Sequence, residues 1–378
     1  MFSFTIPGTG ITIPGIDVDD IPGVDIPVDL DGDKSITDAV QTNRKRYGVP
    51  GLIAATLKDG KLDEIAAAGV RQAGKTDRVR WGDQFFVASV TKPMTSTLAA
   101  RLVERGYIKW DTKLIDVYPK LDGRIREQYE NVTLRQLLSH RSGMQESLPT
   151  DLTVSSAIAP GTPQKIRDNY LPTILRLKPV DKVGDYNYSN VGYIVAGAMM
   201  ESAMRESYEN LMQRLVFKPL GMDSAGFGWP GSSSRLNQPR PHNVAGSSLS
   251  PDSLLRFPGI YNPSGGVHLN VTDWAKFAGV QLGQAPKRFL TSDTIKFLRT
   301  PYDGPGTKYG MGWNVVSETG ISLIQHDGTD GNWHASMMLN PKEKTAILVA
   351  TNRGGPAGVG AVEQTIADLS GRVIKLNI

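Results

Sequence analysis

The strongest constraint on the fold is a series of three apolar strand patterns near the C-terminal end, over residues 321–326, 335–339 and 345–351. Short turn-forming segments separate them. Connections this short favour antiparallel strands, because parallel strands need a crossover of about a dozen residues or more. An amphipathic stretch from about residue 360 to 375 then predicts a helix. The C-terminal part is therefore expected to form an antiparallel sheet closed by a helix.

The N-terminal half contains a second sheet-forming region. A helical stretch from Ser35 to about Tyr47 is followed by two strand patterns around a Lys-Asp-Gly turn. A short apolar strand and a helix with proline in its first turn come next. The ranges are residues 52–58 and 62–69 for the hairpin, 85–87 for the short strand and 91–105 for the helix.

The middle of the chain, about residues 111–290, is mostly helical and rich in loops, with clearer helices at 134–138, 191–215 and 271–282. We therefore predict an α+β fold, in which an antiparallel sheet is flanked by helices and joined to a mostly helical part. One catalytic domain would span residues 34–378. Its α/β part would be residues 34–110 and 291–378, and its helical part residues 111–290.

Residues 1–33 form a segment of their own. Ile-Pro-Gly recurs at residues 6–8, 13–15 and 21–23, and the segment holds seven Asp but no Lys or Arg. Such frequent proline excludes a helix or a central strand. We expect an extended arm that lies on the body or on a second subunit and could support a homo-oligomer. A partly ordered tail is the alternative. No EF-hand loop is completed here, so calcium is not expected.

Composition narrows the class of protein. The chain of 378 residues is 39% hydrophobic and 21% charged, as in soluble globular proteins. It has no cysteine, which excludes disulfides and thiol nucleophiles. Five histidines without an H-E-x-x-H pattern give no reason to expect a metal or other cofactor. The net charge is +4, without a basic cluster interleaved with aromatics, so nucleic acid is not expected as a partner.

No apolar run is long enough to span a membrane, and the N-terminus shows no signal-peptide pattern. We therefore expect a cytoplasmic protein, and the alternative of a removed export signal stays open.

The first chemical motif is residues 89–92, Ser-Val-Thr-Lys, the only S-x-x-K in the chain. Positions three apart share one face of a helix, so Lys92 can reach the hydroxyl of Ser89. A serine hydroxyl needs a base to become a nucleophile, and a lysine of lowered pKa can serve. The alternative is a capping serine beside a solvated lysine.

The second motif is Tyr188-Ser189-Asn190, which follows a turn and precedes a helix. A tyrosine beside an ammonium can be shifted toward phenolate and act as a general base. The same Y-x-N pattern occurs at Tyr129, expected on the surface, and at Tyr208, expected to be structural. A core tyrosine is the alternative for Tyr188.

The third motif is residues 326–329, His-Asp-Gly-Thr, at the end of a strand. Gly328 would let a substrate approach the backbone closely. The amide of Thr329 could pair with that of Ser89 as an oxyanion hole. His326 would add a polar or cationic group beside the nucleophile.

The order S-x-x-K, Y-x-N and H-x-G resembles the superfamily of class C beta-lactamases, DD-peptidases and serine esterases. Other segments resemble it too, and the resemblance covers about residues 35–378. These segments are VTLRQLLSHRSG at 132–143, SGGV at 264–267, TDWAKF at 272–277 and YGMGW at 309–313.

The resemblance implies a beta-lactamase/transpeptidase-like fold with the active site between its two parts. It implies that Ser89 is the nucleophile, that Lys92 and Tyr188 share the base role, and that Asn190 binds substrate or orients Lys92. His326, Gly328 and Thr329 would bind substrate. Trp313, like Trp333 and Tyr309, is a candidate for lining the ligand groove.

The expected function is that of a serine hydrolase that forms an acyl-enzyme on Ser89, and the first-ranked activity is that of a carboxylesterase on short or medium acyl esters. Alternatives are a D-amino-acid peptidase or amidase, beta-lactamase-like activity, an acyltransferase, and a penicillin-binding or sensor module without turnover. The substrate would be a small ester, amide or lactam. Efficient beta-lactam hydrolysis is not expected, because a histidine meets the lactam carboxylate less reliably than a lysine at neutral pH.

Overall fold

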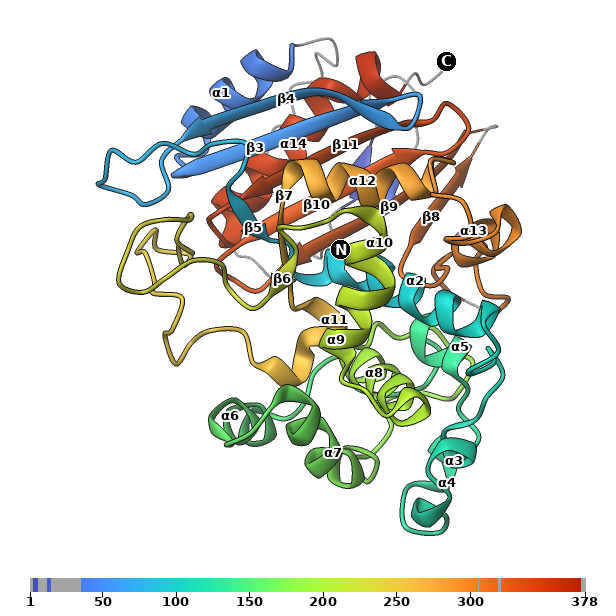
Figure 1. Cartoon of the computed structure of the whole chain (residues 1–378). Coiled ribbons are helices and arrows are strands. Elements are labelled where there is room, and N and C mark those ends of the chain that lie inside the picture. Colours follow the sequence, from blue (N-terminus) through green and yellow to red (C-terminus); the bar gives the residue numbers. More distant parts are fainter. Residues whose placement is uncertain (1–2, 6–11, 15–34, 305, 319–320, 375–378) are drawn as a thin grey trace.

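The computed structural model describes residues 3–5, 12–14, 35–304, 306–318 and 321–374. A six-stranded antiparallel sheet dominates the upper part of the molecule (Figure 1). Its strand order is β4-β3-β11-β10-β9-β8, so the N-terminal hairpin pairs with the C-terminal strands through β3 and β11. The strands are β3 (Gly51–Lys58), β4 (Lys61–Gly69), β8 (Asn314–Glu318), β9 (Ile321–Thr329), β10 (His334–Asn340) and β11 (Thr345–Thr351).

Helices cover both faces of this sheet. Leu52 and Ala54 of β3 pack with α1 (Ile36–Arg46) and α14 (Gly355–Ile374), whereas Ile53 and Ala55 belong to the larger core on the other face. Alternate residues of a strand point to opposite faces, so a run that is buried on both sides reads as continuously apolar. The helix α12 (Val271–Gln281) lies on the second face, against β3, β4 and β11.

A smaller three-stranded sheet lies beside the nucleophile region. Its order is β5-β7-β6, with β5 (Gln84–Phe86), β6 (Gly226–Phe227) and β7 (Val267–Asn270). The chain leaves β5, forms the 3₁₀ turn η1 (Ala88–Val90) and enters α2 (Thr91–Glu104). Because β7 and α12 lie inside the range 111–290, the predicted helical part contains elements that pack with the sheets.

The helices in the lower half of Figure 1 form the helical part. A buried ion-pair network joins three of them: Arg167 contacts Glu201 at 2.5 Å and Glu209 at 2.9 Å. These residues lie on α7 (Pro163–Ile174), α8 (Asn190–Met204) and α9 (Tyr208–Met212). The remaining α-helices are α3 (Leu114–Val117), α4 (Glu127–Glu130), α5 (Leu134–Leu138), α6 (Thr150–Ile158), α10 (Lys218–Leu220), α11 (Asn262–Gly265) and α13 (Ser292–Arg299).

Two expectations in this region were wrong. The helix predicted over residues 191–215 ends at Met204, because Arg205 adopts a left-handed conformation with φ 53° and Ser207 caps a new helix. Tyr129 is buried rather than on the surface, because the short helix α4 turns its ring into the core.

The N-terminal segment is described only at two short strands, β1 (Ser3–Thr5) and β2 (Thr12–Pro14), which pair antiparallel. The rest of the predicted arm lies outside the described residues. Within the part of the chain that is described, no helix has the length and apolar character needed to cross a membrane.

Candidate active site

Ser89 lies at the junction of the small sheet and α2. The preceding residue, Ala88, has φ 44°, a left-handed conformation that is uncommon for a residue with a side chain. Ser89 is partly exposed and lines a cavity of about 290 Å³ together with Asn190, Ser264 and Thr329. The sharp turn thus presents the Ser89 hydroxyl to a hollow that a small substrate can enter.

Lys92 is fully buried beneath that cavity. Its Nζ lies 3.0 Å from Oγ of Ser89, 2.7 Å from Oδ1 of Asn190 and 2.9 Å from the carbonyl oxygen of Ser264. Burial lowers the pKa of Lys92 well below its ordinary value, and the distant charge of Glu146 offsets this only in part. The predicted contact between Ser89 and Lys92 is therefore present in the fold.

The contacts of Lys92 suit an amine that exchanges a proton with Ser89. An ammonium would donate to all three oxygens. After loss of one proton, the oxygens of Asn190 and Ser264 can accept from the two remaining N–H groups, and the lone pair can face the hydroxyl of Ser89.

Tyr188 stands over the same amine, with the centre of its ring 4.7 Å from Nζ of Lys92. Burial raises the pKa of Tyr188 well above its ordinary value, and the nearby Ser89 side chain only partly opposes this. We expected a shift toward phenolate, but burial acts in the opposite direction and favours the neutral hydroxyl of Tyr188.

His326 is buried below the site, and both its ring nitrogens are engaged. Nδ1 lies 2.7 Å from the carbonyl oxygen of Asp327, which can only accept, so Nδ1 carries the proton. Nε2 lies 3.0 Å from the hydroxyl of Tyr309 and accepts from it. Burial, with a smaller effect of Lys92, lowers the pKa of His326 to about 3. His326 is thus neutral at physiological pH and supplies no cation.

Gly328 brings β9 against the turn that holds the nucleophile. A Cβ at this position would lie 2.7 Å from the amide nitrogen of Ser89 and would collide with the carbonyl oxygen of Val87. Thr329, the next residue, lines the cavity and donates its hydroxyl to the carbonyl oxygen of Trp333. The proximity of this strand to the Ser89 amide is compatible with the predicted oxyanion hole.

Trp313 is placed differently from the other candidates. Its side chain is fully buried in the core and is not among the described residues that line the cavity. Gly312, with φ 82°, lies against the backbone of Lys92 and Pro93, so the bend before β8 packs directly behind Lys92.

Several site residues were missed from the sequence or noted only as parts of a motif. Ser264 was part of the glycine-rich segment, but nothing in the sequence indicated that its carbonyl accepts from Lys92. His140 has φ 59°; its Nδ1 accepts the Ser189 amide at 2.9 Å and its ring packs 4.3 Å from that of Tyr188. Phe257, Pro258, Tyr261 and Asp330 also line the cavity. Two segments, 147–166 and 227–262, contribute lining residues to this cavity and to a second one beside it.

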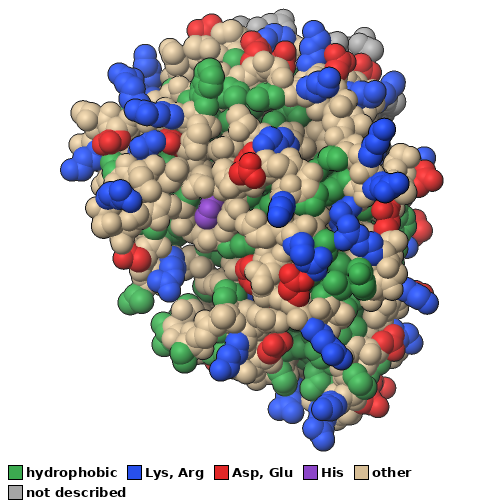
Figure 2. Space-filling view, in the orientation of Figure 1, with side chains coloured by type: hydrophobic (Ala, Val, Ile, Leu, Met, Phe, Trp, Pro, Cys, Tyr) green, Lys and Arg blue, Asp and Glu red, His purple; other side chains and the backbone are tan. Residues whose placement is uncertain are grey.

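A second cavity of about 420 Å³ adjoins the first and shares Phe257 and Pro258 with it. Figure 2 shows the surface hollowed on this side, between the loop-rich part at the left and the helices below. Apolar side chains in its lining include Phe227, Trp229 and Leu254. Among the described residues, no group of three or more His, Asp or Glu side chains could hold a metal ion.

Several curated proteins and solved structures resemble this chain. It is 28% identical over 327 residues to Penicillin-binding protein 4 of Amycolatopsis lactamdurans, with 82% of this chain and 83% of that protein covered. It is 24% identical to Unguisins hydrolase ungD' of Aspergillus campestris and 23% identical to Protein flp of Staphylococcus aureus. Each alignment covers 85% of this chain but only 61% and 63% of those relatives, so the chain spans less than two thirds of their length.

The fold is shared with an octameric penicillin-binding protein homologue from Pyrococcus abyssi, at a TM-score of 0.72 and 21% identity, over 91% of this chain and 78% of that one. D-alanine carboxypeptidase AmpC from Burkholderia cenocepacia gives a TM-score of 0.71 at 19% identity, over 88% and 98%. Residues 36–371 match the Beta-lactamase family. With the match spanning nearly the whole described body and the same fold in these structures, the chain belongs to the Beta-lactamase family of serine hydrolases and penicillin-binding proteins.

Proposed function

We propose that this protein is a serine hydrolase that forms an acyl-enzyme on Ser89 and acts on esters of short or medium acyl chains. One observation supports this most strongly: the hydroxyl of Ser89 lies 3.0 Å from a buried Lys92 amine whose other contacts are two carbonyl oxygens. A dehydrated neutral amine in this position is a base that activates a serine hydroxyl.

The reaction follows from this geometry. Lys92 takes the proton of Ser89 as Oγ attacks the acyl carbonyl, and a tetrahedral oxyanion forms beside the amides of Ser89 and Thr329. Collapse of this intermediate breaks the bond to the leaving alcohol, which takes the proton from Lys92 through the Tyr188 hydroxyl. Water then attacks the acyl-enzyme and gives a proton to Lys92. Lys92 passes this proton to Oγ of Ser89 as the ester bond breaks, which releases the acid and restores both residues.

The neutral state of His326 favours esters over beta-lactams. A lactam substrate carries a carboxylate that a cation stabilises, whereas a simple ester is uncharged and needs none. His326 is neutral and donates its one N–H to the Asp327 carbonyl. The adjoining cavity, lined by Phe227, Trp229 and Leu254, offers apolar surface for an acyl chain longer than acetyl.

Hydrolysis of D-amino-acid peptides or amides is a second candidate. Asp330 lines the nucleophile cavity and accepts from Nε1 of Trp229 at 2.6 Å. A carboxylate there could bind the amino group of a peptide substrate. The names of relatives, a penicillin-binding protein and a hydrolase of unguisins, are compatible with amide substrates.

The deciding experiment compares hydrolysis of p-nitrophenyl butyrate by the wild type, Ser89→Ala and a matched control, Ser234→Ala, at an exposed serine outside the site. We expect Ser89→Ala to lower turnover on the order of 10³-fold or more and the control to match the wild type. Mass spectrometry should find a butyryl group on Ser89. Equal activity of Ser89→Ala would reject the nucleophile, and an inactive wild type would reject the ester substrate in favour of the peptide panel.

A further inference from the structure

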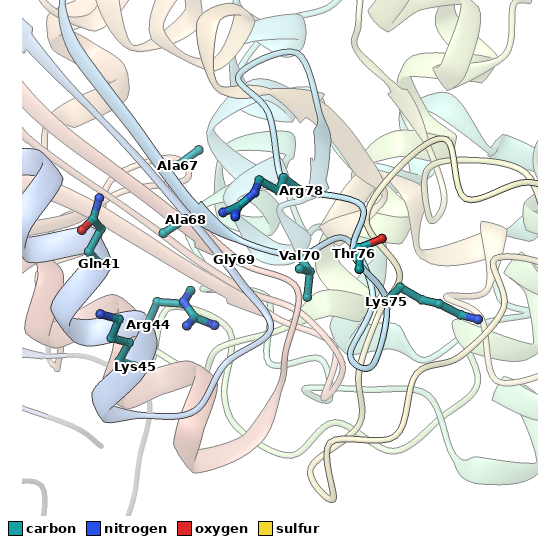
Figure 3. A pocket seen from close by; sticks show the side chains of 10 residues that line it. All are labelled: Gln41, Arg44, Lys45, Ala67, Ala68, Gly69, Val70, Lys75, Thr76 and Arg78. Atoms are coloured by element: carbon teal, nitrogen blue, oxygen red, sulfur yellow. The ribbon is translucent and has the colours of Figure 1, made fainter.

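A cavity of about 530 Å³ lies far from the nucleophile, where the C-terminal end of α1 meets the end of β4. Ten residues line it, of which four are cations and none is acidic. They are Gln41, Arg44, Lys45, Ala67, Ala68, Gly69, Val70, Lys75, Thr76 and Arg78 (Figure 3). We call this the basic cavity. A concave surface lined by one sign of charge attracts ligands of the opposite sign.

The backbone holds the arginines of the basic cavity in place. Gly69 has φ 89° and no side chain, so the stem of Arg44 can lie against it; a Cβ there would come 2.7 Å from Cδ of Arg44. An Nη of Arg44 also donates to the carbonyl oxygen of Val49. The backbones of Arg78 and Val70 form an isolated antiparallel β-bridge just after β4. Figure 3 shows Arg44 and Arg78 on either side of Gly69, from two different segments.

Among the described residues, none of the four cations of the basic cavity forms an ion pair with a carboxylate. Glu64 of β4, for example, pairs with Arg372 at 2.6 Å. The positive charge of the basic cavity is therefore available to a ligand with carboxylate groups. Arginine binds carboxylates well because its planar guanidinium can donate two parallel hydrogen bonds.

The same chain contains an acidic segment that fits this description. Asp17, Asp19, Asp20, Asp25, Asp29, Asp31 and Asp33 lie in residues 1–33, which have no Lys or Arg. We propose that the basic cavity binds aspartate carboxylates of an acidic peptide segment, and that the occupant is residues 17–29 of this protein. In this arrangement the cations of the basic cavity neutralise the carboxylates of the acidic segment, which contains no Lys or Arg.

The connection to α1 is long enough for this contact within one molecule. Nine residues of helix separate Ser35 from Arg44, a rise of about 14 Å. An extended chain covers about 3.3 Å per residue, so about five residues span this distance. Asp29 and all aspartates before it can therefore reach back to the basic cavity. A second copy of the chain could supply the same segment, and the experiment separates the two sources.

The absence of cysteine from the chain allows a direct test. The double variant Val24→Cys with Thr76→Cys places one thiol in the acidic segment and one in the lining of the basic cavity, without removing a charge. The control variant combines Val24→Cys with Lys61→Cys. Lys61 lies at the other end of β4, about 26 Å from Gly69 in the lining of the basic cavity. Both proteins are treated with a short bis-maleimide, and the products are resolved by mass.

We expect the Thr76 pair to crosslink at least threefold more than the control pair. Adding Lys45→Glu and Arg78→Glu, or about 0.5 M salt, should lower that yield by at least threefold, because exposed charges are screened. A product of monomer mass identifies binding within one chain, and a product of dimer mass identifies a second copy. Equal yields for the two pairs, or a yield independent of charge and salt, would overturn the proposal.

Discussion

The hydroxyl of Tyr309 donates a hydrogen bond to Nε2 of His326 over 3.0 Å. The other ring nitrogen of His326 is held by the Asp327 carbonyl, so the ring has no free donor or acceptor nitrogen to offer a substrate. The third motif thus places a neutral side chain, with both ring nitrogens already hydrogen-bonded, at the position where a lysine would carry a positive charge. We propose that this pair limits the substrate range.

Replacement of His326 by lysine should widen that range. His326→Lys adds a flexible cation, and we expect the rate ratio of beta-lactam to ester hydrolysis to rise about tenfold or more, because the lactam carboxylate gains a partner. A chromogenic cephalosporin and p-nitrophenyl butyrate measure the two rates. His326→Gln is the neutral control. If both variants change the ratio equally, the charge at this position does not select the substrate.

The acid limb of the pH–rate profile should report on Lys92. As pH falls through the lowered pKa of Lys92, the amine is protonated and can no longer accept the proton of Ser89, so activity is lost. Asn190→Asp places a carboxylate where Oδ1 lies 2.7 Å from Nζ. An adjacent opposite charge raises the pKa of an amine, by about 1–3 units for close pairs.

We therefore expect the acid limb of kcat/KM to move to higher pH in Asn190→Asp by about one unit or more. The exposed change Asn131→Asp is the matched control for added negative charge. An acid limb that stays in place in Asn190→Asp would mean that a group other than Lys92 limits the rate at low pH.

Gly328 should not tolerate a methyl group. In Gly328→Ala the new Cβ meets backbone atoms of Val87 and Ser89, which cannot rotate away. We expect a loss of about 1–3 kcal/mol in the free energy of unfolding and a fall in kcat of about 100-fold or more. Gly82→Ala, where a Cβ meets nothing within 4 Å, is the control. Near-normal kcat in Gly328→Ala would show that β9 does not constrain the nucleophile turn.

Behind the same strand lies a cluster of titratable groups that should make stability depend on pH. Burial raises the pKa of Asp327 and of Glu363 to about 7, and it lowers that of His334 to about 4. An acid whose pKa is higher in the folded state binds a proton that the unfolded chain has lost. Its contribution to stability therefore falls as pH rises from about 4.5 to 7.

Glu363→Gln removes this loss. Urea unfolding measures the free energy of unfolding of both proteins at each pH. The variant's value minus the wild-type value should increase by about 1–3 kcal/mol between about pH 5 and pH 8. Glu127→Gln, at an exposed position, is the control and should show no such trend. A constant difference between Glu363→Gln and the wild type would show that Glu363 is ionised throughout this range.

The sequence predicted those parts of the fold that depend on local patterns. The C-terminal strands, the N-terminal hairpin, the helix after Ser89 and the capped helix α1 follow from periodicity and capping residues, and all were confirmed. Strand β8 and the pairing of β5 with β6 and β7 were not predicted, because short strands are set by partners distant in the chain. The break at Arg205 was also missed, since arginine itself gives no sign of a left-handed backbone.

For the site, the motifs predicted which residues would meet but not the proton positions. Ser89, Lys92, Tyr188 and Asn190 come together as the resemblance implied. The neutral state of His326 depends mainly on its burial, and the orientations of His326 and Lys92 depend on the Tyr309 hydroxyl and the Ser264 carbonyl, respectively. These are contacts between side chains and backbone groups that no motif encodes.

The three groups around the Lys92 amine also determine when the protein becomes reactive. Asn190 lies 98 residues and Ser264 lies 172 residues from Lys92 in the chain, and both must be in place before water leaves the amine. Until then the lysine is hydrated, protonated and unable to take a proton from Ser89. We therefore expect Ser89 to stay unreactive until both distant segments have packed against Lys92, so that a nascent or partly unfolded chain forms no acyl-enzyme.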